Sequence, residues 1–126
     1  MTLEEIKNEI EGEVVVGHEK LSIELKTAFA ADLMSDVLAF ARSGCLLITG
    51  LTTAQSVRTA FALDIAAIII CRGKMPQEQA IKIAKELHIP IIRTHFIMFE
   101  TCGILYRAGI YGCIREVCIG DNACGV

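Results

Sequence analysis

Residues 45–94 read CLLITGLTTAQSVRTAFALDIAAIIICRGKMPQEQAIKIAKELHIPIIRT, and this stretch decides the fold. It contains three apolar runs, 46–49, 66–71 and 90–92, and each run leads into a turn and a segment with helical spacing. Successive runs start roughly 20 to 25 residues apart, which is the length that a strand, a helix and two short loops require. Apart from Thr49 at the end of the first run, the runs are apolar at every position, as strands covered on both faces are. We therefore predict an α/β fold with a mostly parallel sheet of about four to five strands and helices on both faces.

The flanking segments add elements to this centre. Thr2 and Glu5 form a capping-box pattern, which predicts a helix at the start of the chain. A short apolar run at 14–16 predicts a strand. Apolar and polar residues alternate over 22–29, which predicts a strand near the sheet edge. The sequence thus indicates one domain over 1–126, with a core at about 14–109 and a cysteine-rich tail at 110–126 that we expect to form a short hairpin or to be irregular.

Composition excludes several classes of protein. The chain has 126 residues, of which 53% are hydrophobic, and a net charge of −3, so one domain with a substantial core is expected. The acidic balance argues against nucleic acid and against acidic membrane surfaces as partners. The longest apolar run, 65–71, is far shorter than the roughly 20 residues that span a bilayer. The first residues lack the basic and apolar regions of a signal peptide, so we expect a cytoplasmic protein.

The segment 31–43 predicts a helix with an unusually wide apolar face. Met34, Val37, Leu38 and Ala41 form the expected buried stripe, and further apolar residues at 33 and 40 widen it. A partner subunit would cover this extra apolar surface, although close packing within one chain would also do so. We predict a homodimer with this helix in the interface.

The turns after the three central strands form the candidate ligand site. In a parallel sheet, ligands bind at the carboxyl ends of the strands, where helix N-termini favour anions. The turns supply hydroxyl groups, three cations and glycines, and the candidate residues are Thr49, Gly50, Thr52, Thr53, Arg72, Gly73, Lys74, Arg93, Thr94 and His95. A nucleotide or another small phosphorylated anion is the expected ligand. The alternative is that the cations are solvated loop charges, since no complete phosphate-binding motif is present.

Catalytic signals are sparse. His95 is the one histidine placed at the predicted ligand edge, and the spacing assembles no cysteine–histidine–acid group. We therefore favour a non-catalytic, ligand-sensing regulatory module. The alternative is a small enzyme that acts on a phosphorylated metabolite through Thr49, Arg72, Arg93 and His95.

The six cysteines divide into two groups. Cys45, Cys71 and Cys102 fall in or beside predicted strands and helices, where a buried thiol acts as a small apolar side chain. The tail cysteines are Cys113, Cys118 and Cys124, and they suggest a metal or iron–sulfur centre, with Cys102 as a further candidate ligand. Their spacing matches neither zinc knuckles nor the common ferredoxin patterns, so zinc or iron–sulfur binding and reduced or buried thiols both stay open.

Four segments carry a family resemblance, namely 30–36, 47–50, 68–73 and 89–94. Through them the chain resembles the DRTGG domain family, a small α/β regulatory module that occurs beside CBS domains in some pyrophosphatases and within long phosphate acetyltransferases. It is also similar to the N-terminal domain of the kinase/phosphorylase that acts on the histidine phosphocarrier protein. The positions of the family's Gly-Asp-Arg and Thr-Gly-Gly hold Gly50-Leu51-Thr52 and Cys71-Arg72-Gly73 here.

The resemblance implies a non-catalytic, dimer-forming sensor or scaffold. Ligand contacts made by the Asp-Arg pair of the family motif are not carried over, because this chain lacks that pair. Stand-alone members of this size resemble proteins encoded alongside iron-only hydrogenases and histidine kinases. This implies a partner protein in a redox or hydrogenase-linked system.

Overall fold

The computed structural model describes residues 1–119 and contains one six-stranded sheet with the strand order β1-β5-β4-β3-β2-β6. The strands are β1 (Glu13–Val16), β2 (Thr27–Ala30), β3 (Leu46–Thr49), β4 (Ala67–Ile70), β5 (Ile91–Arg93) and β6 (Tyr111–Gly112). The α-helices are α1 (Leu3–Glu9), α2 (Met34–Phe40), α3 (Ala54–Ala62), α4 (Glu78–Leu87) and α5 (Met98–Ala108). A short 3₁₀ helix, η1 (His18–Lys20), follows β1.

Strand direction confirms the predicted parallel sheet. β2, β3, β4 and β5 pair in parallel in that order, and β6 adds to β2 in parallel. β1 alone of the described strands runs antiparallel, beside β5. The carboxyl ends of β2 to β5 therefore lie at one edge of the sheet, and we call this edge the carboxyl rim.

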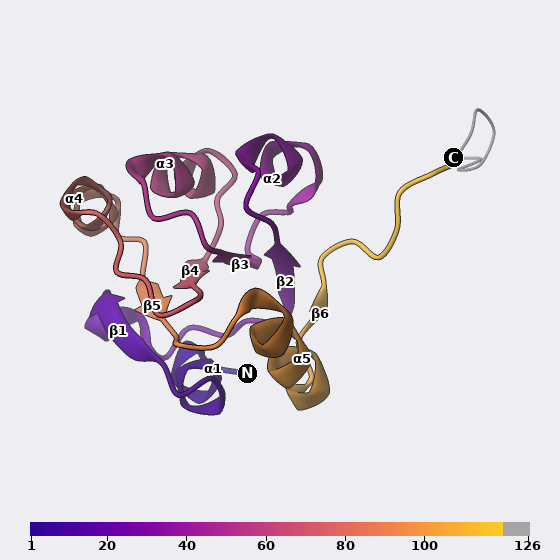
Figure 1. The fold of residues 1–126 in the computed structure, drawn as a ribbon, viewed down its shortest axis with the longest axis horizontal. Coiled ribbons are helices and arrows are strands. Elements are labelled where there is room, and N and C mark those ends of the chain that lie inside the picture. Colours follow the sequence, from indigo (N-terminus) through magenta and orange to yellow (C-terminus); the bar gives the residue numbers. More distant parts are fainter. Residues whose placement is uncertain (120–126) are drawn as a thin grey trace.

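Helices cover both faces of the sheet, as the apolar strands predict. α2, α3 and α4 lie on one face, and α1 and α5 lie on the other (Figure 1). The side chains of β4 alternate between the two cores: Ile68 and Ile70 join the cluster beneath α2 to α4, and Ile69 joins the cluster beneath α1 and α5. All three are fully buried, so both faces of the central strand exclude water.

The first helix begins as predicted, but the strand predicted over 22–29 is shorter than expected and forms β2. Thr2 and Glu5 form the complete capping box of α1. The alternating segment 22–29 forms a strand only from Thr27, because the backbone of 21–25 is hydrogen-bonded to the start of the chain. The N–H of Leu25 donates to the Met1 carbonyl at 2.7 Å, and the N–H of Leu3 donates to the Ile23 carbonyl at 2.9 Å.

Two further expectations need correction. The sheet has six strands and not four or five, because the tail supplies the two-residue strand β6 rather than a hairpin. The helix predicted over 31–43 spans only Met34–Phe40, since Ala41 turns to an extended conformation. Leu38 lies on the outer side of this helix and is 54% exposed, so it does not belong to the buried stripe, whereas Met34, Val37 and Ala41 are buried as predicted. Within residues 1–119, no helix is long and apolar enough to cross a membrane.

Candidate functional site

The carboxyl rim is formed by the segments that follow four parallel strands. Asp32 follows β2, Thr49 and Gly50 end β3, and Arg72 follows β4. The last residues of neighbouring strands lie opposite one another: Thr49 pairs with Ile70, and Ile70 pairs with Arg93. The segments that follow these strands therefore start at the same level. The rim is therefore one continuous edge, as the sequence predicts.

Asp32 is the rim residue that sequence reasoning did not select. Its Oδ1 accepts a hydrogen bond from the Gly50 N–H at 2.6 Å and one from the Thr49 hydroxyl at 3.3 Å. The Thr49 oxygen in turn accepts from the Leu51 N–H at 3.2 Å. The carboxylate thus holds the turn between β3 and α3. Its negative charge is favourable there, because backbone N–H groups before a helix favour anions. Its position two residues after the end of β2 is the signal that could have identified it.

Arg72 lies against this turn and defines the surface of the rim. Its backbone has a positive φ of 68°, a conformation that non-glycine residues rarely adopt, and its N–H donates to the Phe96 carbonyl at 2.9 Å. The guanidinium Nη2 donates to the Gly50 carbonyl at 3.4 Å. A Cβ at position 50 would lie 2.5 Å from that same Nη2. Glycine at 50 therefore lets the guanidinium cover the backbone of the turn.

The side chains at the end of β5 and just after it contact residues 10–13 instead of Gly50. Arg93 Nε lies 3.3 Å from Glu13 Oε1, because the antiparallel strand β1 places Glu13 directly opposite it. His95 Nε2 lies 3.9 Å from Glu11 Oε1. Thr94 is buried, and its hydroxyl donates to the backbone carbonyl at position 10 at 2.7 Å. The rim thus brings Thr49, Gly50 and Arg72 together. The side chain of Arg93 contacts β1, and those of Thr94 and His95 contact the connection between α1 and β1.

The remaining predicted rim residues support the two turns. The Gly73 N–H donates to the Thr94 carbonyl at 2.8 Å, and the Thr52 carbonyl accepts from the backbone N–H of residue 77 at 2.9 Å. Thr53 is the N-cap of α3, and its side chain makes no capping hydrogen bond. Lys74 is exposed. The hydroxyl of Thr53 and the ammonium of Lys74 are therefore open to solvent or to a ligand.

The cysteines of the domain core are buried, as expected. Cys45 and Cys71 are fully buried. Burial raises the pKa of the Cys45 thiol to about 11, with a further increase from the neighbouring Cys113 thiol. Burial also raises the pKa of Cys71 and of the partly buried Cys102. All of these thiols are consequently protonated near neutral pH, which makes them poor nucleophiles.

The predicted metal centre involves Cys113, Cys118 and Cys124. Cys113 packs against the core beneath α2, and its thiol lies 4.0 Å from the Phe40 carbonyl. Cys124 lies outside the described residues. Within residues 1–119, no three side chains of histidine, cysteine, aspartate or glutamate gather as metal ligands would. Metal binding by the tail stays a prediction.

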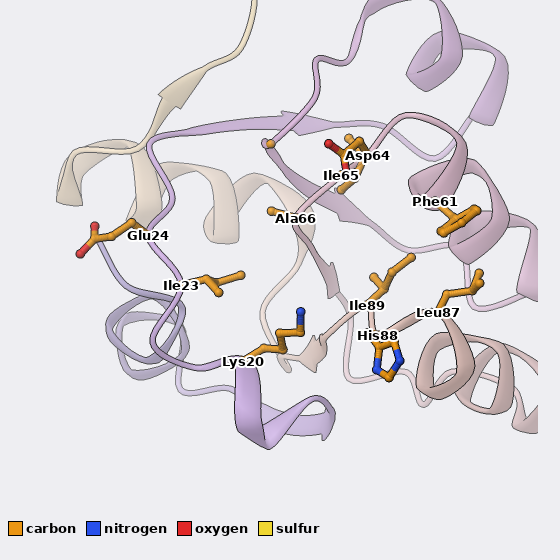
Figure 2. Close-up of a pocket in the computed structure, with 11 residues that line it drawn as sticks. Lys20, Ile23, Glu24, Phe61, Asp64, Ile65, Ala66, Leu87, His88 and Ile89 are labelled. Atoms are coloured by element: carbon orange, nitrogen blue, oxygen red, sulfur yellow. The ribbon is translucent and has the colours of Figure 1, made fainter.

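A hollow of about 440 Å³ lies at the opposite edge of the sheet, among residues that lead into β3, β4 and β5 (Figure 2). Lys20 points into it, whereas the Glu24 carboxylate points away and lies 3.3 Å from the N-terminal ammonium. Asp64 also lines the hollow, and its carboxylate accepts from the Ser43 hydroxyl at 2.9 Å. The helices α3 and α4 end here, and helix C-termini favour cations rather than anions. This edge is therefore less suited to a phosphate than the carboxyl rim.

Comparison with protein families places the fold. The sequence profile of the DRTGG domain matches residues 5–108. The chain belongs to the DRTGG domain family. Its fold is similar to that of a solved structure, the CBS and DRTGG domains of the regulatory region of Clostridium perfringens pyrophosphatase complexed with the activator diadenosine tetraphosphate.

The likeness to the pyrophosphatase region has a TM-score of 0.70 at 21% sequence identity. It covers 82% of this DRTGG domain chain and 45% of the pyrophosphatase chain, so the chain matches less than half of that regulatory region. No curated protein matches the chain. The similarity shows a common fold, which agrees with the predicted α/β class.

The role of Asp32 in this DRTGG domain can be tested by stability. Asp32→Ala leaves the buried N–H of Gly50 without its acceptor, which costs about 1–3 kcal/mol of unfolding free energy. Asp36→Ala, an exposed position in the first turn of α2, is the matched control and costs less than about 1 kcal/mol. Urea denaturation followed by circular dichroism measures both. Equal losses in the two variants would contradict the assigned role.

Proposed function

We propose that this DRTGG domain is a regulatory module that binds a nucleotide or another phosphorylated anion at the carboxyl rim. The observation that carries the proposal is the placement of the Arg72 guanidinium against Gly50, next to the start of α3. A guanidinium is well suited to phosphate, because it offers several N–H donors in one plane. The ligand would therefore lie over the turn from Leu51 to Thr53.

The start of α3 adds to this attraction. The N-terminus of an α-helix carries unpaired N–H groups and a partial positive charge. Since the Thr53 side chain makes no capping hydrogen bond, no side chain of the N-cap competes with a ligand there. The hydroxyl groups of Thr52 and Thr53 and the exposed Lys74 supply further donors. The exposed Asp32 already accepts the Gly50 N–H, so the ligand would use the donors beyond that N–H.

The pyrophosphatase region of similar fold supports the choice of ligand class. That region is a regulatory one, and it was solved with the activator diadenosine tetraphosphate. A nucleotide with several phosphates is thus a reasonable first ligand to test on this chain. We propose binding of the phosphate groups and make no assignment for the bases.

The enzyme alternative receives less support from the rim. A phosphoryl-transfer or hydrolytic enzyme needs an acid–base group within hydrogen-bond reach of the reacting atoms. His95 lies beside Glu11, and Arg93 is paired with Glu13, on the side of the rim next to β1. The carboxylate of Asp32 is engaged by the backbone. These contacts favour a binding module over a catalyst.

Calorimetric titration tests the ligand proposal. We expect ATP, ADP or diadenosine tetraphosphate to bind, and Arg72→Ala to weaken that binding about tenfold or more, because charge-assisted hydrogen bonds to phosphate are lost. Arg58→Ala removes an exposed arginine from α3 and is the matched control, with unchanged affinity. Inorganic phosphate is titrated in parallel to separate phosphate binding from nucleotide binding. The proposal is wrong if none of these compounds binds, or if both variants bind like the wild type.

We also propose that the chain forms a homodimer through the outer surface of α2. Leu33 and Leu38 are 62% and 54% exposed there, and Phe61 on the adjacent helix α3 is 57% exposed. Exposed leucine and phenylalanine side chains on neighbouring helices are typical of a surface that a partner covers.

Light scattering after gel filtration tests the dimer. We expect the wild type to elute with the mass of two chains at micromolar concentration. Leu33→Lys combined with Leu38→Lys places two charges in the interface, so the mass should fall to one chain. Gln55→Lys combined with Gln79→Lys adds the same charge at exposed positions of α3 and α4 and should leave the mass unchanged. A wild-type monomer would refute the dimer.

A further inference from the structure

An apolar pocket of about 220 Å³, open to solvent on one side and called the chamber below, lies between α5 and the edge of the sheet beside β6. Its floor is formed by Ala28 and Ala30 of β2 and by Ile48 of β3. Because alanine side chains end at Cβ, they do not fill the space between the sheet and the helix. The other lining residues are apolar or aromatic except for one thiol, and they are Phe29, Cys102, Leu105, Tyr106, Ile110, Tyr111, Gly112 and Ile114.

A wider hollow of about 650 Å³ adjoins this chamber. It is lined by five residues, of which all but Arg115 also line the chamber: Tyr106, Tyr111, Gly112, Ile114 and Arg115. The two tyrosine rings meet edge to face with centroids 5.3 Å apart, and both are more than half exposed. The chamber and the outer hollow therefore form one groove with an aromatic pair between them.

The charge of the groove is positive. Arg115 is the one ionisable lysine, arginine, aspartate or glutamate side chain that lines either part. It is exposed, and within residues 1–119 no carboxylate pairs with it. A guanidinium at the mouth of an apolar chamber complements a molecule that has an apolar body and an anionic end.

We propose that this groove binds a small organic anion whose aromatic ring or short acyl chain enters the apolar chamber while its anionic group contacts Arg115. The size agrees, since an apolar cavity of about 150 Å³ holds a benzene molecule and the chamber is somewhat larger. The site is separate from the carboxyl rim. The proposal for the groove does not depend on the phosphorylated ligand proposed at the rim.

Fluorescence titration of the full chain with 8-anilinonaphthalene-1-sulfonate tests the groove, because this probe is an aromatic anion. Ala30→Leu fills the chamber and Arg115→Gln removes the charge, and we expect each to weaken binding about tenfold or more. Ala62→Leu, at an exposed position of α3, and Arg58→Gln are the matched controls and should bind like the wild type. Unchanged binding in both groove variants would overturn the proposal.

Competition identifies the body of the ligand. Octanoate and phenylacetate are each titrated against the bound probe, and displacement by one and not the other distinguishes an acyl chain from an aromatic ring. Failure of both to displace the probe would overturn the proposal. So would a loss of probe binding as the protein concentration rises, because that result would mean that a second copy of the chain covers the groove.

The thiol of Cys102 gives a readout that does not depend on the folding of a variant. It lines the chamber, whereas Cys45 and Cys71 are fully buried elsewhere. We expect N-ethylmaleimide at mildly alkaline pH to label Cys102, and saturating probe to slow this labelling at least fivefold, as peptide mass spectrometry would measure. Labelling of Cys102 at the same rate with and without the probe would contradict occupation of the chamber.

Discussion

Parallel pairing of four short apolar strands is the constraint on which the rest of this structure depends. β2 to β5 have few residues each, and the side chains of β3 and β4 are entirely buried. Such strands can be stable only if helices cover both faces of the sheet. Each parallel connection must therefore cross back over the sheet through a helix. This crossing places the turns after β2 to β5 at the carboxyl rim, so the location of the candidate site is a consequence of burial.

The same constraint explains which parts of the fold were predictable. Continuous apolar runs such as 66–71 have few other interpretations, and the capping box at Thr2 is local. β6 was not predictable, since two residues give no periodic signal, and its pairing depends on β2 far away in the chain. The alternating pattern of 22–26 predicted a strand where the backbone instead bonds to the N-terminal segment. In both cases a contact between distant parts of the chain, and not the local sequence pattern, decides the structure.

The candidate site shows the same division. The residue types at the rim follow from the turns, so Thr49, Gly50 and Arg72 could be selected in advance. The hydrogen bonds and ion pairs of the predicted rim residues could not be predicted, because they depend on contacts between distant parts of the chain. Thr94 bonds to a carbonyl 84 residues earlier. Asp32 was missed because the sequence predicts a helix over 31–43, whereas α2 begins only at Met34 and leaves Asp32 in the turn after β2.

The short strand β6 has a mechanical consequence for the groove. It pairs with β2 over only two residues, and backbone hydrogen bonds flank this short pairing, from the Tyr111 N–H to the Lys26 carbonyl at 3.2 Å and from the Cys113 N–H to the Ala28 carbonyl at 2.9 Å. Breaking so few bonds costs much less than global unfolding, and edge segments of this kind open first. Residues of β6 also line the apolar chamber. Separation of β6 from β2 would therefore open the chamber while the central strands keep their positions. Solvent exchange at these two amides would then report the opening of the chamber rather than the stability of the domain.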